Sequence, residues 1–129
     1  ALAATVDLLG AAKDVTRRVL VAGEMLELGS TSAELHREAG RHAAGKADWI
    51  LAVQGDAKEI VAGAVATGHP AARTRFFDNS EAAAEFLAAF VERGDFVLVK
   101  GSRGVKMERI VAALRARHPH PAGAAERRG

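Results

Sequence analysis

Short apolar runs alternate with longer amphipathic stretches along most of this chain. The runs lie at residues 19–22, 49–53, 75–77 and 96–99, and none is longer than five residues, a length typical of buried parallel strands. A regular alternation of strand and helix favours parallel strands joined by right-handed crossovers. The sequence therefore predicts an open α/β sheet.

The stretches between the runs have apolar residues at the spacing of amphipathic helices. Repeats at i, i+3, i+4 and i+7 place these residues on one face of a helix, which can then pack against a sheet. The clear stripes are Ala57, Ile60, Val61, Ala64 and Val65; Ala83, Phe86, Leu87, Phe90 and Val91; and Met107, Ile110, Val111 and Leu114. Weaker patterns are Leu35, Ala39 and Ala43 within residues 31–45, and Leu2, Val6 and Leu9, which predict a helix leading into the first strand.

Polar residues and glycines mark the expected helix boundaries. Thr31 with Glu34, and Asp56 with Glu59, have the spacing of a capping box, in which two side chains satisfy free backbone groups at a helix start. Asp78 is a candidate capping residue in its own turn. Glycines at positions 45, 68 and 94 stand where helices should stop, because glycine readily adopts the left-handed conformation common there.

The bulk composition indicates one globular domain. The chain has 129 residues, of which 49% are hydrophobic and 26% charged. A formal net charge of +2 gives little support to nucleic-acid binding, and the absence of cysteine excludes disulfides and is compatible with a reducing cytoplasm. No segment has the apolar length of a membrane span, and residues 1–10 lack the basic start of a signal peptide. Because the chain does not begin with methionine, we expect it to be a piece of a longer protein.

Residues 1–117 are expected to form the domain, with residues 1–16 as its lead-in helix and linker. The segment HPHPAGAAERRG, from His118 onward, is rich in proline, glycine and charge. Such a composition predicts a flexible tail over residues 118–129.

Four turns leave a predicted strand and enter a helix, at the edge of an open α/β sheet where ligands gather. They are residues 23–29 (GEMLELG), 54–56 (QGD), 78–80 (DNS) and 100–104 (KGSRG). KGSRG is the most informative, because Lys100 and Arg103 place positive charge near a helix N-terminus, where free N–H groups already favour anions. The turn suits a carboxylate or a phosphate, but a glycine-eased turn with a solvated arginine explains the same pattern.

Other polar residues near these turns have weaker signals, each with a structural alternative. Glu24 could bind an ammonium group or a metal, or position the helix that follows. A lone histidine such as His36 beside an apolar stripe is more often structural or solvated than functional. Asp56 is explained by capping as well as by substrate binding, and Trp49 most simply belongs to the core. The sequence has no P-loop, no G-x-G-x-x-G after a strand and no metal-ligand spacing, so the residues alone indicate an anion-binding edge on part of a larger catalyst.

Four blocks of sequence, taken together and in order, resemble the C-terminal domain of the Mur ligase family, in the branch that adds D-alanyl-D-alanine. They are VLVAGEMLELGSTSAELHREAG, QGDAKEIVAGA, FFDNSEAAAEFL and GDFVLVKGSRGVKMERIVAAL, within residues 18–115. GEMLELG with a histidine several residues later, combined with KGSRG-x-K-M-E, is specific to that branch. The resemblance implies a Rossmann-like, mostly parallel open sheet with helices on both faces. It also implies that residues 1–16 lead in from a central ATPase domain that this chain lacks.

The resemblance implies an ATP-dependent, ADP-forming ligase that joins D-alanyl-D-alanine to UDP-N-acetylmuramoyl-tripeptide in peptidoglycan precursor synthesis. ATP phosphorylates the terminal carboxylate of the tripeptide, and the amine of the dipeptide attacks the acyl phosphate. The C-terminal domain closes on the central ATPase domain, its partner, and brings the dipeptide to the reacting group. ATP and Mg²⁺ are expected mainly on the central domain and not on this fragment, which alone should be inactive. A cytoplasmic location is expected, with no nucleic-acid or membrane partner.

Residue by residue, the resemblance assigns the KGSRG turn to the cleft. Ser102 and Arg103 are expected to hold the dipeptide or its carboxylate, since the arginine fork suits a carboxylate. Lys100 is expected to support the turn or the phosphate end.

The remaining candidates belong to neighbouring strand ends. Glu24 and His36 are secondary candidates at the same rim, and Glu24 stands where an aspartate is common in the family. Gln54 and Asp56 come from the strand end where sister ligases bind their incoming amino acid. The alternative function is a stand-alone Rossmann-like binding module for a small anion or nucleotide, while an oxidoreductase is disfavoured by the missing glycine fingerprint.

Overall fold

A computed structural model describes residues 2–26, 28–101, 105–117 and 124–128 of the chain. Within these ranges one sheet of five strands has the order β3-β2-β1-β4-β5, and every neighbouring pair is parallel. The predicted open, parallel α/β sheet is confirmed. The strands are β1 (Arg17–Gly23), β2 (Trp49–Val53), β3 (Thr74–Phe77), β4 (Asp95–Gly101) and β5 (Ala124–Arg128).

Each predicted apolar run lies inside one of the strands β1 to β4, but β1 and β4 begin earlier, with charged residues. Arg17, in β1, donates to the carboxylate of Asp95 in β4 from Nε at 2.8 Å and from Nη2 at 2.6 Å. The hydrogen bond to buried Asp95 is the main reason why the pKa of Arg17 is raised above its ordinary value. An apolar run marks only the buried centre of a strand. Strand ends that are held by ion pairs are therefore not predicted from such a run.

Strand β5 differs from the prediction of a flexible tail. Ala124–Arg128 pairs with β4 in parallel register, from Val97 opposite Ala124 to Gly101 opposite Arg128. The tail expected over residues 118–129 did not include a strand in this segment. The sequence AAERR contains no apolar run, so no strand periodicity could have identified it.

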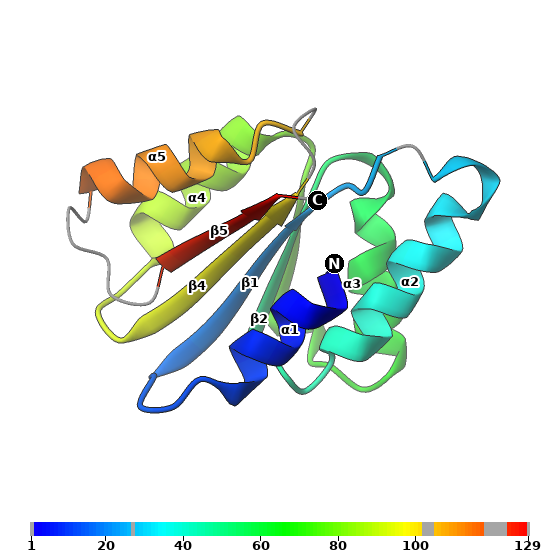
Figure 1. Cartoon of the computed structure of the whole chain (residues 1–129), viewed down its shortest axis with the longest axis horizontal. Coiled ribbons are helices and arrows are strands. Elements are labelled where there is room, and N and C mark those ends of the chain that lie inside the picture. The colour runs from blue at the N-terminus through cyan, green and yellow to red at the C-terminus, as the bar shows by residue number, and fades with distance from the viewer. Residues whose placement is uncertain (1, 27, 102–104, 118–123, 129) are drawn as a thin grey trace.

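Helices cover both faces of the sheet, as predicted (Figure 1). Helices α1, α2 and α3 pack on one face, and α4 and α5 pack on the other. Helix α1 is the predicted lead-in helix, and its Leu2, Val6 and Leu9 are buried. The helices are α1 (Leu2–Ala11), α2 (Ser32–Ala43), α3 (Lys58–Ala66), α4 (Ser80–Phe90) and α5 (Glu108–Arg117).

Alternate residues of the same strands form two hydrophobic cores, because successive side chains of a strand point to opposite faces. Since the central strands are buried on both faces, they read as continuous apolar runs in the sequence. Toward α1, α2 and α3 the strands contribute Leu20, Ala22, Ile50, Ala52 and Leu98, and toward α4 and α5 they contribute Val19, Val21, Leu51, Val53, Val97 and Val99.

The buried face of helix α2 includes Ala43 of the predicted stripe, with Ala39 packed beside it, but not Leu35. Leu35 is 38% exposed, whereas the buried residues of the helix are His36, Gly40 and Ala43. Gly40 lies against the backbone of α3, where a Cβ built on it would come within 1.9 Å of the carbonyl oxygen of Ile60. Backbone-to-backbone contact between the helices therefore decides the buried face, which a count of apolar residues could not indicate.

The helix starts are capped differently from the prediction. The hydroxyl of Thr31 donates to the carbonyl of Leu28, and Glu34 accepts from Arg41 and Arg37, which lower its pKa. Asp56 also makes no side-chain cap, because the N-cap of α3 is Ala57 and has no side-chain hydrogen bond. Neither capping box forms.

For α4 the capping residue is Asn79 rather than Asp78, and its side chain accepts from the N–H of Ala82 at 2.8 Å. The glycines predicted to end helices do have the expected backbone conformation. The glycines at 45, 68 and 94 all have positive φ angles, of 79°, 107° and 95°.

Candidate functional site

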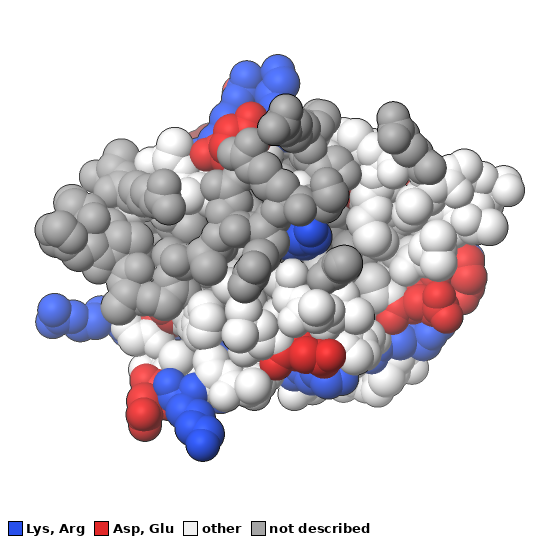
Figure 2. Space-filling view, viewed as in Figure 1, with Lys and Arg blue, Asp and Glu red and all other residues white. Residues whose placement is uncertain are grey.

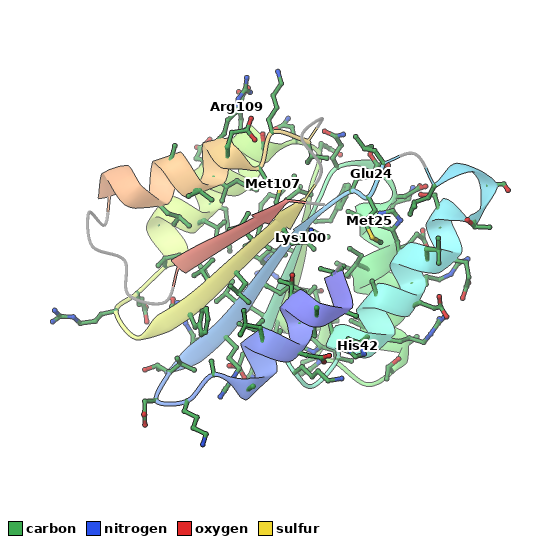
Figure 3. All side chains as sticks on the ribbon, viewed as in Figure 1. Glu24, Met25, His42, Lys100, Met107 and Arg109 are labelled. Carbon is green, nitrogen blue, oxygen red and sulfur yellow. The ribbon has the colours of Figure 1, made fainter. Side chains whose placement is uncertain are left out.

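Strands β1 and β4 are neighbours in the sheet, but the chain leaves them toward opposite edges. From β1 it passes through α2 on one face, and from β4 it enters α5 on the opposite face. Neighbouring parallel strands that lead to opposite faces leave a crevice beyond their carboxyl ends, where open α/β sheets bind ligands. Figure 3 shows Glu24, Met25, Lys100 and Met107 at this end of the sheet.

The ends of β1 and β4 touch at two glycines. A Cβ built on Gly101 would lie 3.4 Å from the Cα of Gly23 and 2.4 Å from the Cγ of Met107. A Cβ on Gly23 would in turn lie 2.9 Å from the sulfur of Met107. The side chain of Met107, just before α5, thus occupies the space that any larger residue at either glycine would fill.

Glu24 links the turn after β1 to the turn after β2. Its N–H donates to the carbonyl of Val53 at 2.9 Å, and its Oε2 accepts from the N–H of Asp56 at 2.8 Å. The amide of Gln54 lies 3.4 Å from the other carboxylate oxygen. The structure therefore brings together three of the predicted site residues, Glu24, Gln54 and Asp56, at neighbouring strand ends.

The QGD turn is held in an unusual backbone conformation. Gln54 has φ 73° and ψ 136°, in a region that residues with a side chain rarely adopt. Gly55 has φ 53°, and a Cβ on it would lie 2.2 Å from Oε2 of Glu24. Such conformations cost free energy and are concentrated at functional sites, where the surroundings impose them.

His36 lies behind the first turn and is fully buried. Its Nε2 accepts from the N–H of Met25 at 2.9 Å, and its Nδ1 lies 2.7 Å from the carbonyl oxygen of Ser32. Both ring nitrogens are engaged within the fold. The histidine therefore does not belong to the surface that Glu24 and Gln54 form.

The KGSRG turn is described only in part. Lys100 is the last residue but one of β4, opposite Ala22 of β1, and by strand alternation its side chain lies on the face that carries α1, α2 and α3. Ser102 and Arg103 lie outside the described residues. The two turns that the site requires nevertheless leave adjacent strand ends.

The described surface carries charges of both signs. On the face drawn in Figure 2, Lys and Arg are interspersed with Asp and Glu around the rim, and no large field of one sign is present on the part that is described. No group of three or more His, Asp or Glu side chains among the described residues could hold a metal ion. Among the described residues, no helix has the length and apolar character needed to cross a membrane.

Met25, Gly55 and Met107 belong to this region but were not singled out as site residues from the sequence. A glycine between two polar residues after a strand is a usable signal for Gly55, because such a turn often needs a positive φ. No comparable signal marks Met25, whose backbone N–H and not its side chain makes the contact.

Comparison with known families matches residues 1–103 to the Mur ligase, glutamate ligase domain. Two curated relatives are UDP-N-acetylmuramoyl-tripeptide–D-alanyl-D-alanine ligases. The one from Treponema pallidum is 36% identical over 107 residues, 76% of this chain and 21% of the relative. The one from Haemophilus influenzae is 32% identical over 120 residues, 84% of this chain and 25% of the relative. The chain thus spans a quarter or less of their length.

Solved structures with the same fold include MurF from Acinetobacter baumannii, with a TM-score of 0.72 and 28% identity over 88% of this chain and 24% of that one. MurF ligase from Thermotoga maritima in complex with ADP gives a TM-score of 0.69 and 26% identity over 90% of this chain and 25% of that one. In both cases the similarity covers nearly all of this chain and a minor part of the larger protein.

Proposed function

The chain belongs to the Mur ligase family, and we propose that it is the C-terminal domain of a ligase that joins D-alanyl-D-alanine to UDP-N-acetylmuramoyl-tripeptide. In this role the domain closes on a central ATPase domain and helps to bind the dipeptide. The cytoplasmic location expected from the sequence is part of the same proposal.

The observation that carries the proposal is the meeting of three strand-end turns at the carboxyl edge of the sheet. The GEMLELG turn, the QGD turn and the start of the KGSRG turn leave neighbouring strand ends there. Open α/β sheets bind ligands at this edge, and binding sites often form where two domains meet. The alternative, a stand-alone binding module, receives no support from relatives that are about four times as long.

Within the crevice we assign the charged turn to the carboxylate of the dipeptide. Arg103 and Ser102 would donate to it, with Lys100 beside them on β4. An arginine can bind a carboxylate through two parallel hydrogen bonds, which fixes its orientation as well as its position. Closure against the central domain would then exclude water and place the dipeptide amine for attack.

We propose that residues of this chain bind neither the nucleotide nor a metal ion. The sequence has no P-loop, and the described side chains include no group suited to a metal ion. In the intact ligase, ATP with Mg²⁺ supplies the phosphoryl group that activates the tripeptide carboxylate, and we assign both to the central domain. The 129-residue chain alone should therefore neither hydrolyse ATP nor form an amide bond.

The proposal is tested by steady-state kinetics of the intact ligase that contains this domain, followed as ADP release. Wild-type enzyme should release ADP only when both D-alanyl-D-alanine and the UDP-linked tripeptide are present. Arg103→Ala should raise the KM for the dipeptide about tenfold or more and leave the KM for ATP unchanged, since hydrogen bonds to charged groups contribute roughly 1.5–3 kcal/mol.

Arg41→Ala is the matched control, because Arg41 lies on α2 and pairs with exposed Glu34. It should leave all kinetic constants unchanged. ADP release that does not depend on the dipeptide would refute the proposed activity. An unchanged dipeptide KM in Arg103→Ala would remove Arg103 from the site.

A further inference from the structure

His36 of α2 forms hydrogen bonds on two sides with the backbone. On one side the N–H of Met25 points at Nε2, and on the other the carbonyl of Ser32 faces Nδ1, with the hydroxyl of Ser32 also 3.3 Å away. Ser32 and His36 are one helical turn apart on α2, whereas Met25 belongs to the turn after β1. The imidazole therefore joins the first turn of α2 to the strand-end turn.

The partners fix which nitrogen carries the proton. A carbonyl oxygen can only accept, so Nδ1 must donate to Ser32, and a backbone N–H can only donate, so Nε2 must accept from Met25. The histidine is thus held as the neutral tautomer with its proton on Nδ1. No lone pair or N–H of the ring is left to contact a substrate.

We propose that His36 is a positioning residue, which orders the turn after β1 through the N–H of Met25 and does not contact the dipeptide. The effect passes to the site through the preceding residue, because the carboxylate of Glu24 accepts a hydrogen bond from the N–H of Asp56 in the QGD turn. Loss of the Met25 hydrogen bond would therefore loosen both turns. This inference rests on the proposed function only for its effect on catalysis.

Two substitutions separate the two hydrogen bonds. The amide oxygen of glutamine lies as many covalent bonds from Cα as Nε2 does, so His36→Gln can still accept from Met25. The amide of asparagine lies one bond closer, at the level of Nδ1, so His36→Asn can still donate to Ser32 but cannot reach Met25. Both variants replace the buried ring with an amide and lose packing. His42→Gln is the control, because His42 lies on the same helix and its partner is Asp7.

The first measurement uses the 129-residue chain and does not depend on the proposed function. Nitrogen-15 NMR of the imidazole should show the proton on Nδ1 of His36, and hydrogen exchange at the amide of Met25 should be slow. Exchange should stay slow in His36→Gln and in His42→Gln and become fast in His36→Asn. Equal protection of Met25 in His36→Asn, or a proton on Nε2, would overturn the inference.

The second measurement uses the intact ligase. We expect kcat/KM for D-alanyl-D-alanine to fall about three- to tenfold in His36→Asn, as for the loss of one hydrogen bond, with the KM for ATP unchanged. His36→Gln should restore it to within about twofold of the wild-type value. An equal loss in both variants, or a loss in neither, would overturn the positioning role. Wild-type enzyme without dipeptide-dependent ADP release would instead refute the proposed function, and the exchange of Met25 would still decide the contact.

Discussion

Gly55 lies against the carboxylate of Glu24 at the proposed site. The carboxylate of Glu24 fills the space where a side chain on residue 55 would begin, and its Oε2 accepts the N–H of Asp56. Because the glycine also has a positive φ, two separate physical requirements disfavour any other residue there. The contact explains why a carboxylate in the GEMLELG turn controls the shape of the QGD turn.

Gly55→Ala should destabilise the chain more than the same change at a glycine that has only the backbone requirement. A left-handed alanine costs about 1 kcal/mol, and displacing the Glu24 carboxylate from its hydrogen bond costs about 1 kcal/mol more. Gly45→Ala is the control, because Gly45 has φ 79° and nothing within 4 Å of its would-be Cβ. Urea unfolding should show a loss of about 2 kcal/mol for Gly55→Ala and about 1 kcal/mol for Gly45→Ala. Equal losses would mean that the Glu24 contact contributes nothing.

Helices α2 and α3 approach each other at two glycines, one on each helix. A Cβ on Gly40 would lie 1.9 Å from the carbonyl oxygen of Ile60, and a Cβ on Gly63 would lie 2.1 Å from that of Arg37. An ion pair between Arg37 and Glu59, with an N–O distance of 2.9 Å, flanks the contact. The pKa of Arg37 is raised chiefly by its hydrogen bond to Glu34. The helices are thus packed at a distance that only glycine allows.

A glycine-to-alanine change in a helix usually stabilises a protein. Gly40→Ala should instead lower the free energy of unfolding. Alanine is favoured over glycine in a helix by about 1 kcal/mol, but overpacking against backbone costs about 1–3 kcal/mol. Gly10→Ala in α1 is the matched control, because the atoms nearest to its Cβ would belong to the side chain of Lys46, at 3.4 Å or more. Urea midpoints should fall for Gly40→Ala and rise slightly or stay level for Gly10→Ala. A rise for Gly40→Ala would contradict the close helix contact.

The molecule as a whole consists of two cores that share one set of strands. Val19 and Leu20, adjacent in β1, belong to opposite cores, and the same alternation holds in β2 and β4. Neither layer of helices can lose its packing without exposing the strands on which the other layer depends. The fold is therefore expected to unfold as one unit.

Cooperativity can be measured with the single tryptophan of the chain. Trp49 lies on the α4 and α5 side, with its ring centre 4.8 Å from that of Phe90, so its fluorescence reports that core. Far-UV circular dichroism reports the helices of both faces. Urea transitions followed by the two signals should coincide within error. A fluorescence transition that clearly precedes or follows the loss of helix would show that the two cores unfold separately.

By itself the sequence determined the parts of the structure that depend on local periodicity. The run at residues 49–53 coincides with β2, the glycines at 45, 68 and 94 have left-handed conformations, and the buried side of α1 was predicted correctly. Each is a property of a short segment, because burial repeats with the period of the strand or helix that the segment forms. The family resemblance rested on the order of such segments and is confirmed.

Only the tertiary structure decided which distant residues meet. The buried face of α2 depends on the backbone of α3, and β5 has no pattern of its own but pairs with β4. Glu24 and His36 were weak candidates in the sequence because their partners, Asp56 and Met25, are selected by the order of strands and by the path of a turn. Contacts of this kind depend on distances between segments, and one-dimensional periodicity contains no information about those distances.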